Sequence, residues 1–112
     1  MPDHVRLVRG TLDACVLRAL TWRPMHGFEI TTWLEHHSGG ALEIEDGTLY
    51  HALVRLEKSR CITAAWQITE NNRRARYYSL TPKGRARFLT ETEELRAYTR
   101  VLTRLLAAEP GS

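Results

Sequence analysis

The chain has 112 residues, of which 43% are hydrophobic and 26% are charged, and its formal net charge is +3 at pH 7. Such a composition is ordinary for a globular domain, and the length allows one small core with an appended helix but not two independent cores. The mild excess of positive charge permits a polyanionic partner without requiring one. With seven glycines and four prolines, the chain is neither collagen-like nor of low complexity.

The compartment is indicated by what the sequence lacks. No apolar run approaches the roughly 18 residues that a membrane span needs, and residues 1–6 lack the apolar stretch of a secretory signal. The two cysteines, Cys15 and Cys61, do not make a disulfide framework. The sequence therefore predicts a reduced, cytoplasmic protein without a membrane partner.

Three short helices are predicted in the first half of the chain. Apolar residues recur at three- and four-residue steps over about 9–21, which predicts a first helix that Pro24 ends. A second helix is predicted over about 26–37, followed by glycines that can adopt the left-handed conformation of a helix end. A third begins at 45–48, where acidic and hydroxyl side chains can cap free backbone N–H groups, and runs to about Ser59. The residues predicted to form the buried face of the second helix are Phe28, Ile30, Trp33 and Leu34.

The period of the apolar residues changes to two after the third helix. Apolar and polar residues alternate over 62–69, which predicts a half-buried strand. A second strand is predicted over 75–80, and residues 70–74, with two asparagines that tolerate positive φ, are expected to form the hairpin tip. The residues expected on the inner face of the first strand are Ile62, Ala64, Trp66 and Ile68.

A long helix completes the chain. Thr81 caps it, Pro82 has the fixed φ that its first position needs, and it is expected to reach about Ala107 before a frayed tail. This order of elements predicts an α+β fold, a winged helix-turn-helix of three helices and a β-hairpin wing, with a long C-terminal dimerisation helix. The expected domains are the winged helix-turn-helix over residues 1–81 and the dimerisation helix with its tail over 82–112.

One side of the third helix carries polar residues that fit a DNA major groove. At about 100° per residue, Leu49, Leu53 and Leu56 fall together and must pack inward. The opposite side provides a hydroxyl, an imidazole, a guanidinium and an ammonium group beside a tyrosine, and such groups bind phosphates and base edges. A solvated helix face has a similar composition, so the helix alone leaves both interpretations open. The candidate DNA-binding residues here are Thr48, Tyr50, His51, Arg55 and Lys58.

Basic residues also gather at the predicted hairpin. Arg73, Arg74 and Arg76 lie at its tip, and residues 73–87 contain six basic side chains and no acidic one. In isolation, a solubilising loop would have the same composition. Combined with the order of the helices and the polar face of the third helix, the basic hairpin favours nucleic-acid binding, and its three arginines join the candidate DNA contacts.

The last helix has more apolar surface than so small a domain can cover. An apolar residue recurs every seven residues, at Phe88, Leu95 and Leu102. Tyr98 and Leu105 form a second apolar line beside it, although Glu91 interrupts the pattern. We therefore predict pairing with a second copy of the chain in a two-fold dimer. The alternative is that this helix folds back over the first helix and buries its seam within one chain. The candidate dimerisation residues are Phe88, Leu95, Tyr98, Leu102 and Leu105.

Metal and catalytic sites are not indicated. On a helix the adjacent His36 and His37 point about 100° apart, and neither cysteine belongs to a CxxC pair. Cys15 lies on the apolar stripe of the first helix and is expected in the core. Cys61 is expected to be a small buried thiol, and the alternative is an exposed thiol that is sensitive to oxidation. No glycine-rich phosphate loop or nucleophile elbow is present, so the sequence predicts neither an enzyme nor a cofactor.

Several strings of residues together resemble the PadR family of bacterial transcriptional regulators, over residues 7–106. The resemblance implies a homodimeric winged-helix repressor, of the compact branch of the family, that releases its operator DNA when a small molecule binds. It also implies that the third helix enters the major groove and that the wing contacts the flanking backbone or minor groove. The strings are Leu7-Val8-Arg9-Gly10-Thr11-Leu12, His26-Gly27-Phe28-Glu29-Ile30, Gly47-Thr48-Leu49-Tyr50, Arg55-Leu56-Glu57, and Arg74 to Thr81 with Gly84.

The sequence departs from that family's pattern at two places. His51 stands where the family commonly has proline, so the operator preference cannot be transferred from the family. Arg60 stands where the family often has a glycine that ends the third helix, and an arginine held at positive φ costs up to about 1 kcal/mol there.

A small-molecule pocket is expected between the last and first helices of the dimer, although ordinary dimer core would use the same side chains. Two other functions stay open. One is a winged-helix adaptor that binds a protein and does not touch DNA, and the other is a ligand-sensing or redox-sensing dimer whose output is not transcription. The candidate pocket residues are Cys15, Trp33, Leu95, Tyr98 and Leu102.

Overall fold

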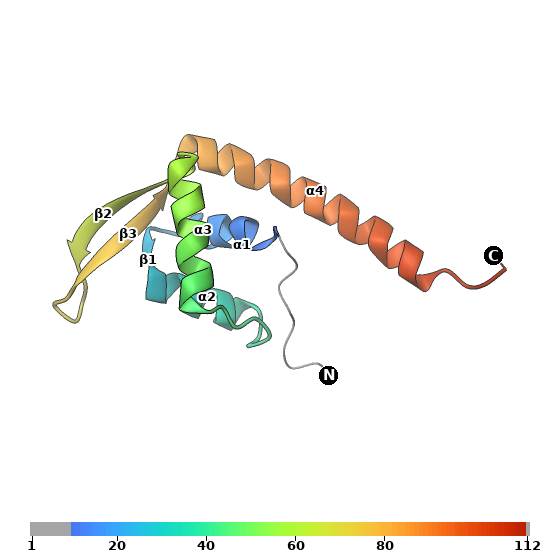
Figure 1. The fold of residues 1–112 in the computed structure, drawn as a ribbon, viewed down its shortest axis with the longest axis horizontal. Coiled ribbons are helices and arrows are strands. Elements are labelled where there is room, and N and C mark those ends of the chain that lie inside the picture. Colours follow the sequence, from blue (N-terminus) through green and yellow to red (C-terminus); the bar gives the residue numbers. More distant parts are fainter. Residues whose placement is uncertain (1–9, 112) are drawn as a thin grey trace.

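The fold, seen in a computed structural model that describes residues 10–111, is a small helical domain with a hairpin at one end and a long helix at the other (Figure 1). The α+β winged-helix prediction and the order of its elements are confirmed. The first nine residues and Ser112, which include the start of the first predicted helix and the end of the predicted tail, lie outside the described residues. The elements are α1 (Leu12–Leu20), β1 (Met25–His26), α2 (Gly27–His37), α3 (Asp46–Lys58), β2 (Ile62–Ile68), β3 (Arg74–Leu80) and α4 (Pro82–Ala107).

The sheet has three antiparallel strands in the order β1-β3-β2. The hairpin pairs Ile62 with Leu80 at its base and Ile68 with Arg74 near its tip. The short strand β1, which the sequence did not predict, pairs Met25 with Tyr78 along the free edge of β3. This pairing ties the start of α2 to the base of the hairpin, and so fixes the hairpin beside the helices.

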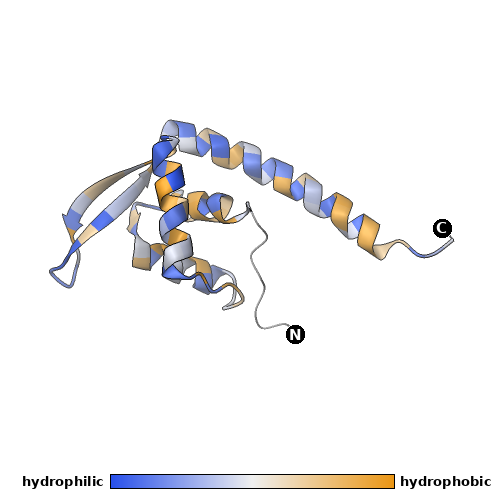
Figure 2. Cartoon of the chain, viewed as in Figure 1, coloured by the Kyte–Doolittle hydropathy of each residue, from blue (hydrophilic) through white to orange (hydrophobic). Residues whose placement is uncertain are grey.

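The core lies between α1, α2, α3 and the base of the sheet. Val16, Leu17, Ile30 and Leu56 are fully buried there, together with Ile62 from the base of β2. Figure 2 shows a second apolar region at the far end of α4, where the helix runs away from the core. The radius of gyration is 16.3 Å, against about 13 Å for a compact chain of this length. Among the described residues, no helix is both long and apolar enough to span a membrane.

Three side chains predicted to be buried are exposed instead. Phe28 is 77% exposed, because it lies in the first turn of α2 on the side away from the core. Trp66 and Ile68 are 59% and 61% exposed, because the outer half of the hairpin extends beyond the helices that cover its base. Side chains predicted to be buried are buried where a helix covers them, as at Ile30 and Ile62. They are exposed where no helix covers them.

The helix starts are stabilised in different ways. His26 caps α2 through a capping box, in which the Glu29 backbone N–H donates to His26 Nδ1 at 3.3 Å and the His26 N–H donates to Glu29 Oε1 at 3.2 Å. Thr81 caps α4 as predicted, accepting the Gly84 N–H at 3.0 Å. Helix α3 begins after Glu45, whose side chain forms no capping hydrogen bond, so the predicted position is correct and the predicted side-chain cap is wrong.

Helix α3 ends in a Schellman motif with an arginine at its left-handed position. The Cys61 N–H donates to the Leu56 carbonyl at 2.9 Å, and the Arg60 N–H donates to the Glu57 carbonyl at 3.0 Å. Arg60 has a φ of 63°, a conformation that is unfavourable for a residue with a Cβ atom. The strain expected from the sequence at this position is therefore present.

We expect Arg60→Gly to raise the free energy of unfolding by about 1 kcal/mol, because glycine adopts positive φ without a Cβ clash. Urea denaturation followed by circular dichroism measures the change. Asn72→Gly is the matched control, since Asn72 also has positive φ (59°) but asparagine tolerates that region, so its gain should be smaller. A loss of stability in Arg60→Gly would contradict the prediction.

Candidate nucleic-acid interface

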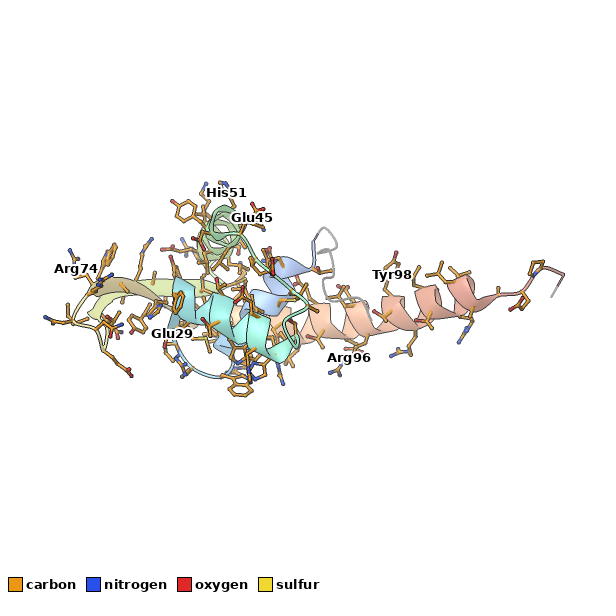
Figure 3. The ribbon with its side chains drawn as sticks, turned by 90° about the horizontal axis from the view of Figure 1, so that it is seen from below. Glu29, Glu45, His51, Arg74, Arg96 and Tyr98 are labelled. Carbon is orange, nitrogen blue, oxygen red and sulfur yellow. The ribbon has the colours of Figure 1, made fainter. Side chains whose placement is uncertain are left out.

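The polar face of α3 is exposed, as the helical spacing predicts. Leu49, Leu53 and Leu56 are buried against the domain, and Figure 3 shows His51 pointing outward from the opposite side of the helix. The five predicted DNA contacts on this helix are all exposed: Thr48, Tyr50, His51, Arg55 and Lys58.

The wing brings three further predicted residues next to α3. A groove of about 710 Å³ lies between α3, the start of α2 and the hairpin, and Tyr50 lines it from the helix while Arg73, Arg74 and Arg76 line it from the wing. These four side chains are therefore brought together. The remaining members of the α3 face do not line this groove and project from the helix itself.

Two of the predicted DNA contacts are held by carboxylates of the same chain. Arg55 Nη2 donates to Asp13 Oδ1 at 2.8 Å, and Arg76 Nη2 donates to Glu57 Oε2 at 2.8 Å. A guanidinium group has five N–H donors, so each arginine keeps donors that can reach a phosphate. Their net charge toward DNA is nonetheless reduced, and the unpaired positive charge of the interface rests on other residues. In the described part of the chain, Lys58, Arg73 and Arg74 form no ion pair.

The wing also carries an aromatic group that sequence reasoning assigned to the core. The guanidinium carbon of Arg74 lies 4.8 Å from the centre of the Trp66 ring. The strand register explains the contact, because Ile68 pairs with Arg74 and Trp66 is two residues from Ile68 on the same face of the hairpin. Stacking on the ring restricts where the guanidinium can point. The exposed wing therefore offers both positive charge and an apolar face.

Helix α4 is packed on its own domain only at its start. Phe88 is 8% exposed and lies in the core, with the Arg18 guanidinium 5.6 Å from its ring centre. The assignment of Phe88 to a dimer seam is therefore corrected, because α1 covers α4 at this level. For these first turns the alternative of packing within one chain is the right one.

Beyond its start, α4 leaves the domain on the side opposite the wing (Figure 1). Leu95 is half-buried, whereas Tyr98 and Leu105 are 60% and 66% exposed, and Leu102 is also exposed. Figure 3 shows Tyr98 and Arg96 on opposite sides of the helix. The four remaining candidate dimerisation residues thus lie on a part of α4 that its own chain leaves largely uncovered.

A second cavity, of about 610 Å³, lies between α1, α2 and α4. Of the five candidate pocket residues, Cys15, Trp33 and Leu95 line it, whereas Tyr98 and Leu102 do not. Its wall includes His37 stacked on Trp33 with the ring centres 4.1 Å apart. Burial raises the pKa of the Cys15 thiol, which therefore stays protonated at neutral pH. Cys61 is buried, so a redox role that needs an exposed thiol is not supported there.

Three helices, a hairpin wing beside the third helix and an exposed polar face on that helix define the winged-helix class of DNA-binding proteins. The family model for the transcriptional regulator PadR-like family matches residues 16–90. The chain belongs to this family, whose members are transcriptional regulators and not enzymes.

Individual proteins are similar to this chain in sequence or in structure. The chain is 31% identical to uncharacterized protein X of Lysinibacillus sphaericus over 85 residues. The aligned region covers 76% of this chain and 77% of that protein. A transcriptional regulator from Clostridium thermocellum has a similar structure, with a TM-score of 0.78, 29% identity, and coverage of 86% of this chain and 93% of that one. A PadR family transcriptional regulator from Eggerthella lenta DSM 2243 has a TM-score of 0.77 and 26% identity, with coverage of 90% and 86%.

Proposed function

We propose that the protein is a homodimeric repressor that binds a palindromic operator through α3 and the wing of each protomer. The observation that carries the proposal is the exposed face from Thr48 to Lys58 beside an arginine-bearing wing. A dimer with two-fold symmetry would present two copies of this face about 34 Å apart, in successive major grooves. This function implies a cytoplasmic location, where the DNA is.

Affinity for any duplex would come mainly from phosphate contacts. Lys58, Arg73 and Arg74 are the best candidates, since no carboxylate in the described residues neutralises them. Sequence preference would come from Thr48, Tyr50 and His51, which are short or planar groups on the exposed face of α3. Arg55 and Arg76 would add contacts through the donors that their ion pairs leave free.

We expect Arg73→Ala to weaken binding to all duplexes and to reduce the slope of log K against log salt concentration by about one for each bound protomer. The Arg73 side chain forms no ion pair within the described residues, so its removal should not disturb the fold. Fluorescence anisotropy with a labelled duplex at several salt concentrations measures both effects. Arg104→Ala, which removes the same charge from the last turn of α4, should leave the slope unchanged. An unchanged slope in Arg73→Ala would contradict the role of this residue.

In vitro selection from a random duplex library tests the proposed function as a whole. A repressor of this kind should enrich a symmetric site with half-sites about one helical turn apart. Failure to enrich any sequence, together with no salt-sensitive binding to random duplex, would favour the adaptor or the ligand-sensing dimer.

The cavity between α1, α2 and α4 is the proposed site for a small molecule that releases the operator. Its supporting feature is a mainly apolar lining, to which Trp33 and Leu95 contribute, next to the helix that we assign to dimerisation. A ligand that binds there would alter the packing of α4 on α1, and so the relative positions of the two DNA-binding domains.

A further inference from the structure

One carboxylate joins three helices of the domain. Asp13 of α1 accepts from Arg55 Nη2 of α3 through Oδ1, at 2.8 Å, and from Arg87 Nη2 of α4 through Oδ2, at 3.2 Å. Each oxygen therefore binds a different guanidinium. The Asp13 side chain is only 14% exposed, so both contacts are partly shielded from water. Arg87 is held in turn by Glu91, its Nε donating to Glu91 Oε2 at 2.6 Å.

Both α3 and α4 pack against α1, and Asp13 lies between the two. Their other contacts with α1 are formed largely by apolar side chains, and such contacts are non-directional. A charge-assisted hydrogen bond is directional and short, so a carboxylate that binds both helices restricts how each can rotate or slide. The bridge is thus a fixed point between the helix with the exposed polar face and the helix with the uncovered apolar stripe.

We propose that Asp13 is a positioning residue that fixes the orientation of α3 relative to α4, and through it the half-site spacing that the dimer accepts. The inference rests on the proposed function, in which α3 reads DNA and α4 pairs with a second copy. Each additional base pair between half-sites moves the second groove along the duplex and around it. A rigid joint therefore rejects wrong spacings, whereas a loosened joint tolerates them.

The chain offers a matched control for this bridge. Glu57 and Arg76 form an ion pair at the same distance, 2.8 Å, and also involve α3, but they join it to β3 of the wing and do not reach α4. Glu57→Gln should therefore remove a comparable interaction without loosening the joint between α3 and α4.

The first experiment is independent of DNA. Spin labels are placed at His51→Cys on α3 and Arg104→Cys on α4. Cys15→Ala removes the partly exposed native thiol, and Cys61 can stay because it is buried. Diluting the labelled chain into unlabelled protein restricts the measurement to pairs within one chain. Pulsed electron paramagnetic resonance should show a broader distance distribution in Asp13→Asn than in the parent or in Glu57→Gln. Equal widths in Asp13→Asn and the parent would overturn the proposal.

The second experiment uses duplexes that carry two copies of the selected half-site at centre-to-centre spacings from about 9 to about 12 base pairs. The parent and Glu57→Gln should discriminate between the best and the worst spacing by at least about tenfold, and Asp13→Asn by no more than about threefold. Affinity for a single half-site should rise by a similar factor in Asp13→Asn and Glu57→Gln, because each substitution releases an interface arginine from its carboxylate. Retained discrimination between spacings in Asp13→Asn would overturn the proposal. No binding of any duplex by the parent would overturn the proposed function instead, and the role of Asp13 would then be decided by the spin-label distances.

Folding of each variant is checked by circular dichroism. If Asp13→Asn does not fold, Arg87→Met takes its place, because it removes the α4 half of the bridge and leaves the Asp13–Arg55 pair. The same broadening and the same loss of discrimination are then expected, and their absence would overturn the proposal.

Discussion

Replacing Gly84 by alanine is expected to lower the free energy of unfolding by about 3 kcal/mol. A Cβ atom at this position would lie 2.0 Å from the Cys61 carbonyl oxygen and 2.9 Å from the Cys61 carbonyl carbon. That carbonyl cannot move aside freely, because it accepts hydrogen bonds from both the Thr81 N–H and the Thr81 hydroxyl, each at 3.0 Å. The added methyl group must therefore displace backbone at the joint between the hairpin and α4.

Chemical denaturation of Gly84→Ala measures this loss. Gly47→Ala is the matched control, because Gly47 lies in α3 and a Cβ atom there meets nothing within 4 Å. That variant should gain up to about 1 kcal/mol, since alanine is the better helix residue. Opposite signs for two Gly-to-Ala changes in one chain would establish that close packing, and not helix propensity, requires the glycine at 84. A Gly84→Ala variant as stable as the parent would refute the packing argument.

The fold was predictable from the sequence to the extent that local patterns determine it. The three- and four-residue spacing of α1 to α3, the alternation that marks the hairpin and the Thr81-Pro82 start of α4 all act over a few residues. Strand β1 could not be predicted, because two residues carry no period and their partner Tyr78 lies far away in the sequence. The exposure of Trp66 could not be predicted either, since alternation shows which face is apolar but not where the covering helices end.

The candidate site was predictable in its composition but not in its pairing. Arg55 and Arg76 stand out as basic residues on a helix and on a wing, and the structure places both there. Their carboxylate partners are 42 and 19 residues away, respectively. Neither helical nor strand periodicity relates residues at such separations. The division of arginines into those that hold the domain together and those that are free for a polyanion therefore required the tertiary structure.

The apolar stripe on the outer part of α4 is the feature that a second copy of the chain would cover. Leu95, Tyr98, Leu102 and Leu105 follow one another at three- and four-residue steps, and most of this surface is exposed. A two-fold axis near Tyr98, in the middle of the stripe, would bring the two stripes together as an antiparallel pair.

Tyr98→Glu is therefore expected to weaken dimerisation by about a hundredfold or more, which corresponds to about 3 kcal/mol. Near a two-fold axis a single substitution introduces two carboxylates that face each other in an apolar seam. The fold of each chain should survive, because the Tyr98 side chain is largely exposed within its own chain. Thr103→Glu adds the same charge at an exposed position of α4 outside the stripe, so it should leave the dimer intact.

Sedimentation velocity over a range of concentrations measures the monomer–dimer equilibrium in both variants. The operator affinity of Tyr98→Glu should fall in parallel, because a monomer engages one half-site and loses the gain from binding two linked sites. Binding to a single half-site should remain, since α3 and the wing are untouched. A Tyr98→Glu protein that sediments as the parent does would place the dimer contact elsewhere, and the exposed stripe of α4 would then need another partner.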